Sequence, residues 1–227
     1  MGKRLRARRR IDAFRHGDNR RMTLLLIRHG ETALNAARVL QPAHTPLSAR
    51  GLRQAEAIAW RVAALAPAAI LASDLPRAWQ TACAIGAASG LAPIASSALR
   101  ERDFGELRGR AYDSLGFDPL AMTAAPPGGE SAADFAARVA RAFAEALALH
   151  ARAATAGSLA VVTHGLVIET LLTRHARLAP DAVVPRRLAN ASLSVVATEP
   201  PHAVELIGCT LHLDDTARDT GGGLHGG

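Results

Sequence analysis

A short, wholly apolar run that ends in a histidine and a glycine constrains the fold of this chain more than any other feature. Leu24 to Ile27 are four consecutive aliphatic residues, and Arg28, His29 and Gly30 follow directly. A continuous apolar run of this kind is typical of a parallel strand buried on both faces. Open α/β sheets bind their ligands just beyond the carboxyl ends of such strands. The sequence therefore predicts an α/β fold with His29 at a ligand-binding edge.

An Arg-His-Gly sequence alone is a weak indicator, because residues 15–17 contain a second copy. His16, however, follows a run of arginines and no apolar run. We therefore expect only His29 to act as a nucleophile.

Apolar runs and alanine-rich helical stretches alternate along the chain. This pattern predicts a three-layer α/β sandwich, in which a mostly parallel central sheet carries helices on both faces. We expect strands near residues 23–28, 68–72, 92–96, 158–163, 192–197 and 203–208. We expect helices near residues 48–65, 74–90, 131–152 and 165–175.

Three helix starts carry capping residues. Ser48 and Ser131 are predicted to cap the first and third helices, and Ser73 or Asp74 the second. Arg77 would then lie in a first helical turn, where anions are favoured by free N–H groups and by the helix dipole.

The positive charge of the chain is concentrated at its start. The 227 residues carry a net charge of +7, and residues 1–21 account for all of it. A block of like charge with little apolar content is expected to be disordered and to bind anions weakly. We predict a basic disordered extension over 1–21, one domain over 22–213, and a disordered glycine-rich tail over 214–227. An anion or nucleic-acid binder working through the arginines remains an alternative, although specific nucleic-acid binding is not expected of the neutral remainder.

The two cysteines, Cys83 and Cys209, lie far apart and in no metal-binding or redox motif. We expect two free, buried thiols and a cytoplasmic protein. No apolar run is long enough to suggest a membrane span, so no membrane partner is expected.

Four segments, each after a predicted strand or at a helix start, carry the polar residues suited to chemistry. They are residues 28–35, 73–82, 99–109 and 161–165. In this order they resemble the histidine phosphatase superfamily, the phosphoglycerate mutase-like proteins, over residues 23–175.

The resemblance implies that His29 is transiently phosphorylated and that Glu101 is the general acid. Asp103 and Glu106 are close enough to remain alternatives for the acid. The phosphate-binding residues that the resemblance implies are Arg28, Asn35, Arg77 and His164. No metal and no cofactor are expected. Histidines without a motif are expected at the surface or in loops: His44, His150, His175, His202, His212 and His225.

The resemblance favours a phosphatase over a mutase. Mutase relatives carry a longer basic insertion after the acid, whereas residues 102–129 are short and contain only Arg102, Arg108 and Arg110. The turn at residues 127–131 resembles that of α-ribazole and broad-specificity phosphatases. Pro42 stands where glycine is usual, and Leu166 replaces a second glycine, so the loops beside the pocket differ. We expect a phosphomonoester phosphatase acting on a small phosphorylated metabolite, as monomer or homodimer, with phosphoglycerate mutase as the alternative.

Overall fold

The computed structural model describes residues 22–153 and 157–213. The predicted disorder of residues 1–21 and 214–227 lies outside these described residues.

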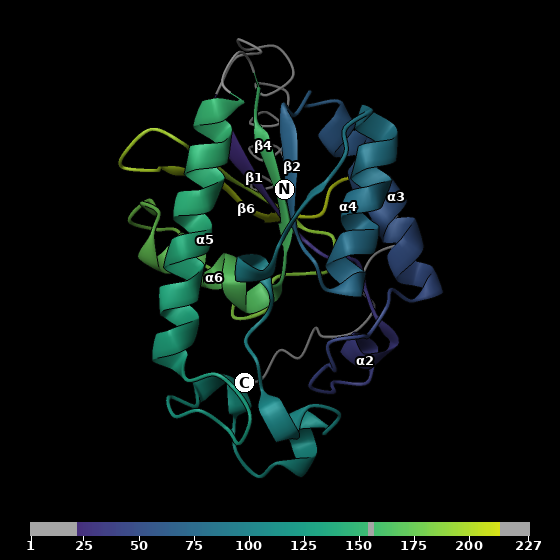
Figure 1. Ribbon diagram of the computed structural model, residues 1–227, viewed down its shortest axis with the longest axis vertical. Helices are drawn as coiled ribbons and strands as arrows, with labels where there is room; N and C mark the ends of the chain where they lie inside the picture. Colours follow the sequence, from purple (N-terminus) through teal and green to yellow (C-terminus); the bar gives the residue numbers. More distant parts are fainter. Residues whose placement is uncertain (1–21, 154–156, 214–227) are drawn as a thin grey trace.

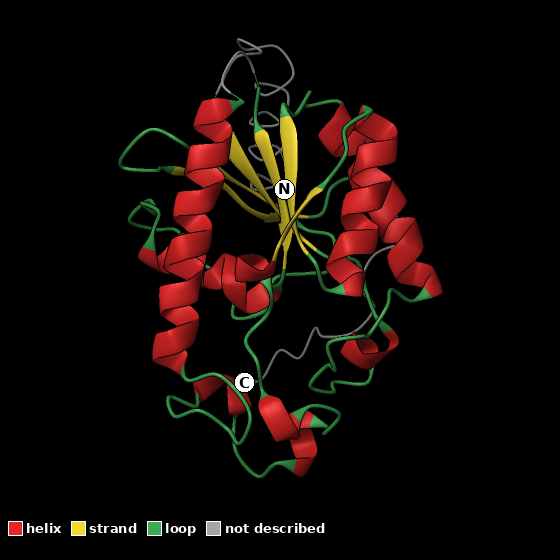
Figure 2. Cartoon of the chain, viewed as in Figure 1, coloured by secondary structure: helices red, strands yellow, loops and turns green. Residues whose placement is uncertain are grey.

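Six strands form one sheet in the order β3-β2-β4-β1-β5-β6 (Figure 2). Their bounds are β1 Thr23–Arg28, β2 Ala69–Ser73, β3 Ile94–Ser96, β4 Leu159–Thr163, β5 Leu193–Ala197 and β6 Val204–Cys209. Strands β3, β2, β4 and β1 are mutually parallel, and only β5 runs against its neighbours. The prediction of a mostly parallel sheet is confirmed.

Helices cover both faces of the sheet, so the predicted three-layer sandwich is also confirmed (Figure 1). One face carries α3 and α4, and the other carries α5 and α6. The helix bounds are α2 Ala33–Ala36, α3 Ala49–Ala63, α4 Pro76–Ser89, α5 Ala132–Arg152 and α6 Gly165–Arg174. Within the described residues, no helix is both long enough and apolar enough to cross a membrane.

Strand β1 explains why the opening run is apolar throughout. Leu25 and Ile27 pack with α3 and α4, whereas Leu24 and Leu26 pack with α5 and α6. All four side chains are at most 2% exposed. Successive residues of a strand point to opposite faces, so a central strand with two covered faces needs apolar residues at every position.

Two of the three predicted helix caps are confirmed. The hydroxyls of Ser48 and Ser131 accept hydrogen bonds from backbone N–H groups in the first turns of α3 and α5. The prediction for α4 is wrong, because its N-cap is Leu75 and no side chain caps it. The carboxylate of Asp74 instead pairs with Arg100.

The predicted burial is wrong at three positions. Both cysteines are free, but Cys83 is exposed and Cys209 is partly exposed. His150 is 4% exposed, because it lies on the inner face of α5, where Nε2 donates to the carbonyl of Gly157. His225 lies outside the described residues.

Candidate active site

The carboxyl ends of β1 and β4 bring two distant histidines together. The rings of His29 and His164 have centroids 5.1 Å apart and are tilted by 59°. Both side chains are at most 2% exposed. Because the two parallel strands are hydrogen-bonded neighbours, the two histidines meet at one edge of the sheet.

The ring nitrogens of His29 have distinct roles. Nδ1 lies 2.6 Å from the carbonyl oxygen of Gly30. A carbonyl can only accept, so Nδ1 carries the proton and Nε2 holds a free lone pair. Burial, followed by the charges of Arg77 and Arg28, holds the pKa of His29 well below its usual 6.5. The imidazole is therefore neutral and nucleophilic at neutral pH.

His164 is positioned by Ser73 at the end of β2. Its Nε2 lies 2.9 Å from the hydroxyl of Ser73. That hydroxyl accepts the N–H of Leu75, so it can donate its own proton to Nε2. Nδ1 of His164 is buried and has no hydrogen-bond partner among the described residues. It is available to donate to an oxygen of a bound ligand.

Two arginines supply positive charge beside the histidines. Arg28 donates to the carbonyl of Leu188. Arg77, in the first turn of α4, is 2% exposed, and its buried Nε has no partner within the described ranges. Burial lowers the pKa of Arg77 to about 10, against the opposing effect of Glu101. Both guanidinium groups remain charged and suited to a phosphoryl group.

Glu101 is the carboxyl group next to this cluster. Its two oxygens accept the backbone N–H groups of Arg102 and Leu166 at 3.0 and 3.2 Å. Burial raises the pKa of Glu101, while those two bonds and the charges of Arg77 and Arg28 oppose the rise. A raised pKa favours the protonated carboxyl that a general acid needs. The alternatives fit less well, because Asp103 pairs with Arg108 and Glu106 is exposed.

The segment that follows Glu101 is closed at its base and held by two arginines. Residues 103–129 begin and end side by side, joined by Glu106 N–H to Pro127 and Glu130 N–H to Asp103 bonds of 3.0 and 2.8 Å. Arg138 donates to the carbonyls of residues 98, 100 and 101, and Arg102 to those of residues 122, 124 and 130. These contacts fix the backbone that carries Glu101.

Asn35 lies near the cluster, but its carbonyl oxygen has a local role. It accepts the N–H of Thr32 in a capping box at the start of α2, and the amide of Asn190. A contact between Asn35 and phosphate therefore depends on its remaining amide N–H groups.

The sequence interpretation missed Asn190 and the second role of Ser73. The amide of Asn190 donates to the carbonyls of His29 and Gly30 at 3.1 and 3.3 Å, which fixes the nucleophile loop. No motif surrounds Asn190, whereas Ser73 directly follows a predicted strand, a position that could have indicated a contact across the sheet edge.

Gly30 makes a close approach that a side chain would prevent. A Cβ at this position would lie 2.4 Å from the carbonyl oxygen of Gly51 in α3. The nucleophile loop therefore packs directly on the backbone of that helix. Among the described residues, no three His, Cys, Asp or Glu side chains are grouped as a metal site would need.

Known proteins resemble this chain over most of its length. The family model described as "Histidine phosphatase superfamily (branch 1)" matches residues 24–207. A probable phosphoglycerate mutase GpmB of Yersinia enterocolitica is 36% identical over 215 residues, which cover 87% of this chain and 98% of that protein.

Solved structures show the same fold. A mycobacterial glucosyl-3-phosphoglycerate phosphatase in complex with VO3 is 30% identical, with a TM-score of 0.67, covering 78% of this chain and 91% of the other. The α-ribazole phosphatase of Shigella flexneri is 24% identical, with a TM-score of 0.69, covering 83% and 96% of the two chains. The second likeness concerns the fold alone.

Proposed function

This chain belongs to branch 1 of the histidine phosphatase superfamily, and from that premise we propose that it is a phosphomonoester phosphatase acting through a phosphohistidine. The observation that carries the proposal is the hydrogen bond from Nδ1 of His29 to Gly30. It leaves Nε2 unprotonated within a cluster of arginine and histidine donors.

In the first step, the lone pair of Nε2 attacks the phosphorus, so a phosphorus–nitrogen bond forms as the bond to the ester oxygen breaks. Glu101 gives its proton to the departing oxygen. Arg28, Arg77 and His164 bind the three equatorial oxygens, whose charge they stabilise in the transition state.

In the second step, water attacks the phosphorus of the phosphohistidine. The ionised Glu101 accepts a proton from that water, and the electron pair of the phosphorus–nitrogen bond returns to Nε2. Inorganic phosphate leaves, and both residues regain their starting protonation states. No metal takes part in either step.

The arginines after Glu101 favour a phosphatase over a mutase. A mutase must hold a second anionic group while it returns the phosphoryl group to its substrate. Arg102 is 5% exposed and occupied by backbone carbonyls, and Arg108 pairs with Asp103. Within the described residues, Arg110 is the only one of these three arginines whose side chain is exposed and makes neither a hydrogen bond nor an ion pair. Phosphoglycerate mutase remains the second candidate, because curated relatives carry that name.

The first prediction concerns the nucleophile. His29→Ala should abolish phosphate release, whereas His16→Ala, in the second Arg-His-Gly copy, should retain the full rate. Rapid quenching with a ³²P-labelled ester should trap label on His29 that is labile to acid and stable to base. Label on serine or aspartate would contradict the mechanism, and conversion of 3-phosphoglycerate to its 2-isomer in a coupled assay would establish the mutase instead.

The two free cysteines suit a reducing compartment. On this ground we propose a cytoplasmic location.

A further inference from the structure

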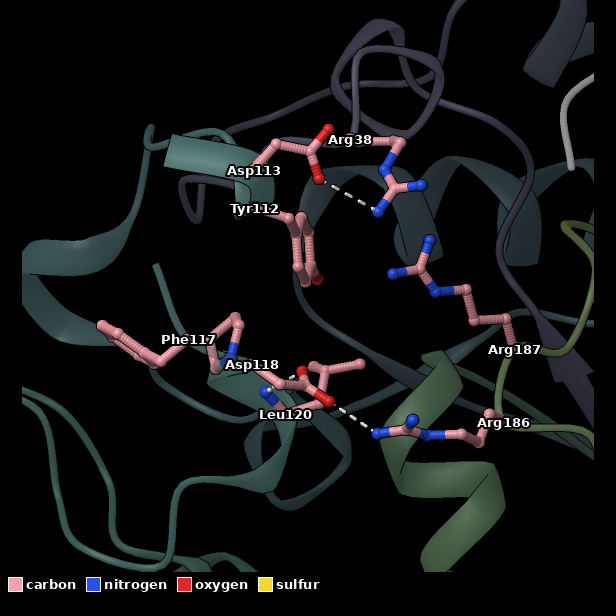
Figure 3. Close-up of a pocket in the computed structure, with 9 residues that line it drawn as sticks. Arg38, Tyr112, Asp113, Phe117, Asp118, Leu120, Arg186 and Arg187 are labelled. Atoms are coloured by element: carbon pink, nitrogen blue, oxygen red, sulfur yellow. Dashed lines mark hydrogen bonds and ion pairs between the residues drawn. The ribbon is translucent and has the colours of Figure 1, made fainter. Parts of the chain in front are cut away.

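Residues from three parts of the chain line a cavity of about 440 Å³. Its walls come from the loop at Arg38, from the 3₁₀ helices Tyr112–Ser114 and Pro119–Ala121, and from the segment before β5 (Figure 3). Three arginines, two aspartates and two aromatic residues line it. The cavity therefore combines a positive charge with flat apolar surface.

Only one of the three arginines lacks a carboxylate partner within the described chain. Arg38 pairs with Asp113 at 3.3 Å, and Arg186 pairs with Asp118 at 2.5 Å. Arg187 pairs with neither, and its guanidinium lies 5.4 Å from the centre of the Tyr112 ring. Figure 3 shows Arg187 reaching toward that ring, with Arg38 on the same side of the cavity.

The backbone connects Arg187 directly to the phosphate-binding cluster. The next residue, Leu188, accepts the hydrogen bond of Arg28 through its carbonyl. Within the cavity wall, Tyr112 N–H donates to the carbonyl of Arg38 at 2.9 Å, which joins two of the lining residues. Burial, and then the charge of Glu101, raise the pKa of Tyr112, while the charges of Arg187 and Arg28 lower it. Tyr112 is thus within electrostatic reach of both the general acid and a phosphate-binding arginine.

We propose that this cavity receives the leaving group of the substrate and that Arg187 binds a second anionic group on it. The inference rests on the proposed phosphatase function, since the cavity wall at Arg187 adjoins Leu188, whose carbonyl accepts the hydrogen bond of the phosphate-binding Arg28. A guanidinium group that has no carboxylate partner and stacks on an aromatic ring can still donate two parallel hydrogen bonds. Its partner is a carboxylate or a phosphate that lies in the plane of the guanidinium group. The substrate class is therefore a phosphomonoester whose alcohol part carries its own negative charge.

The test compares three esters that differ in the second group: 3-phosphoglycerate, propane-1,3-diol bisphosphate, and glycerol 3-phosphate, whose alcohol part is neutral. We expect kcat/KM for the better anionic ester to exceed that for glycerol 3-phosphate by about tenfold, the scale of one hydrogen bond to a charged group. Arg187→Gln should remove this preference, and Arg187→Lys should keep part of it. Arg174→Gln, an exposed arginine at the end of α6, is the matched control and should keep all of it.

Calorimetric titration of the same three compounds into His29→Ala, with and without Arg187→Gln, measures binding in the absence of turnover. The same preference in Kd, lost with Arg187, supports the inference, and the tighter anionic compound identifies a carboxylate or a phosphate as the second group. Equal Kd values for charged and neutral compounds, or a preference that survives Arg187→Gln, would overturn it. If binding shows the preference but none of the esters is hydrolysed by the unmodified protein, the phosphatase proposal fails and the anion site stands.

Discussion

A single carbonyl group determines which nitrogen of His29 can react. The bond from Nδ1 to Gly30 fixes the tautomer, and Asn190 in turn fixes the carbonyls of His29 and Gly30. The general acid depends on its surroundings in a similar way, because burial raises the pKa of Glu101 above its usual 4.5. At the scale of single residues, the site consists of ordinary groups whose protonation is controlled by their immediate neighbours.

We predict that Glu101→Gln affects esters according to their leaving group. For an alkyl phosphate the loss in kcat/KM should be about 10²–10⁴-fold, the usual contribution of general acid catalysis. For p-nitrophenyl phosphate it should be much smaller, since that leaving group departs without a proton. With the unmodified protein, the alkyl phosphate rate should fall as pH rises through the raised pKa of Glu101, because the acid loses its proton.

Glu106→Gln is the matched control, since Glu106 is exposed and should show no dependence on the leaving group. Equal losses on both ester types in Glu101→Gln would leave Glu101 with an orienting role only.

The residues that could be predicted from the sequence are those next to strand ends. His29 and His164 each follow an apolar run, and parallel pairing brings such positions to one edge. Asn190 could not be found in this way, because its contact with His29 spans 161 positions and no local pattern records it. The sequence predicts Asn35 in the pocket but does not reveal its local hydrogen bond. The N–H of Thr32 donates to the side-chain oxygen of Asn35 and occupies that atom.

At the scale of elements, α5 does more than cover the sheet. Arg138 extends from its second turn to the carbonyls of residues 98, 100 and 101, and pairs with Glu130 at 2.7 Å. A helix on one face thereby fixes the loop that carries Glu101. Ser73 does not cap α4: its hydroxyl accepts the N–H of Leu75, the residue before the helix, and contacts His164 across the sheet edge. Ser48 and Ser131 cap their helices as predicted, although their hydroxyls also donate to the carboxylates of Glu31 and Asp134.

We predict that Arg138→Met loosens this loop. It leaves three carbonyls and one carboxylate without their donor, so the free energy of unfolding should fall by about 2–3 kcal/mol. Hydrolysis of alkyl phosphates should fall more than that of p-nitrophenyl phosphate, because the displaced group is Glu101. Urea unfolding and kcat/KM for both esters measure the two effects.

Arg141→Met provides the comparison, since Arg141 lies on the same helix and is exposed. If Arg138→Met changes neither the free energy of unfolding nor the ratio of kcat/KM for the two esters, the loop does not depend on Arg138 for its position.

At the scale of the whole molecule, the buried histidines couple the stability of the fold to pH. His29 and His164 have pKa values well below 6.5, and burial together with Arg61 lowers the pKa of His212 to about 4. Below pH 6.5 the unfolded chain binds protons at these positions and the folded protein does not. Stability is therefore complete above pH 6.5 and is lost as pH falls below it.

We predict that the free energy of unfolding falls between pH 7 and pH 5.5, and that His29→Gln makes this fall shallower. One such group contributes up to about 1.4 kcal/mol per pH unit. Glu101 opposes the trend, because its raised pKa makes the fold more stable as pH falls toward 4.5. Urea titrations at both pH values provide the measurement, and the exposed His44→Gln should leave the slope unchanged. Parallel pH profiles for the unmodified protein and His29→Gln would refute this coupling.

The closed base of residues 103–129 has a consequence for how such an enzyme can diversify. The two ends of the segment meet through backbone bonds, and Gly105, at a φ of 50°, lies so close to Pro127 that an added Cβ would approach its carbonyl oxygen to 2.0 Å. With its ends fixed, the interior can lengthen or change composition at little entropic cost, about 0.6 kcal/mol for each doubling of length. The interior supplies one wall of the cavity, whereas the proposed catalytic residues, His29, Arg28, Arg77 and Glu101, all lie outside it. One unchanged catalytic apparatus can thus acquire new substrates by exchange of a single, self-contained insert.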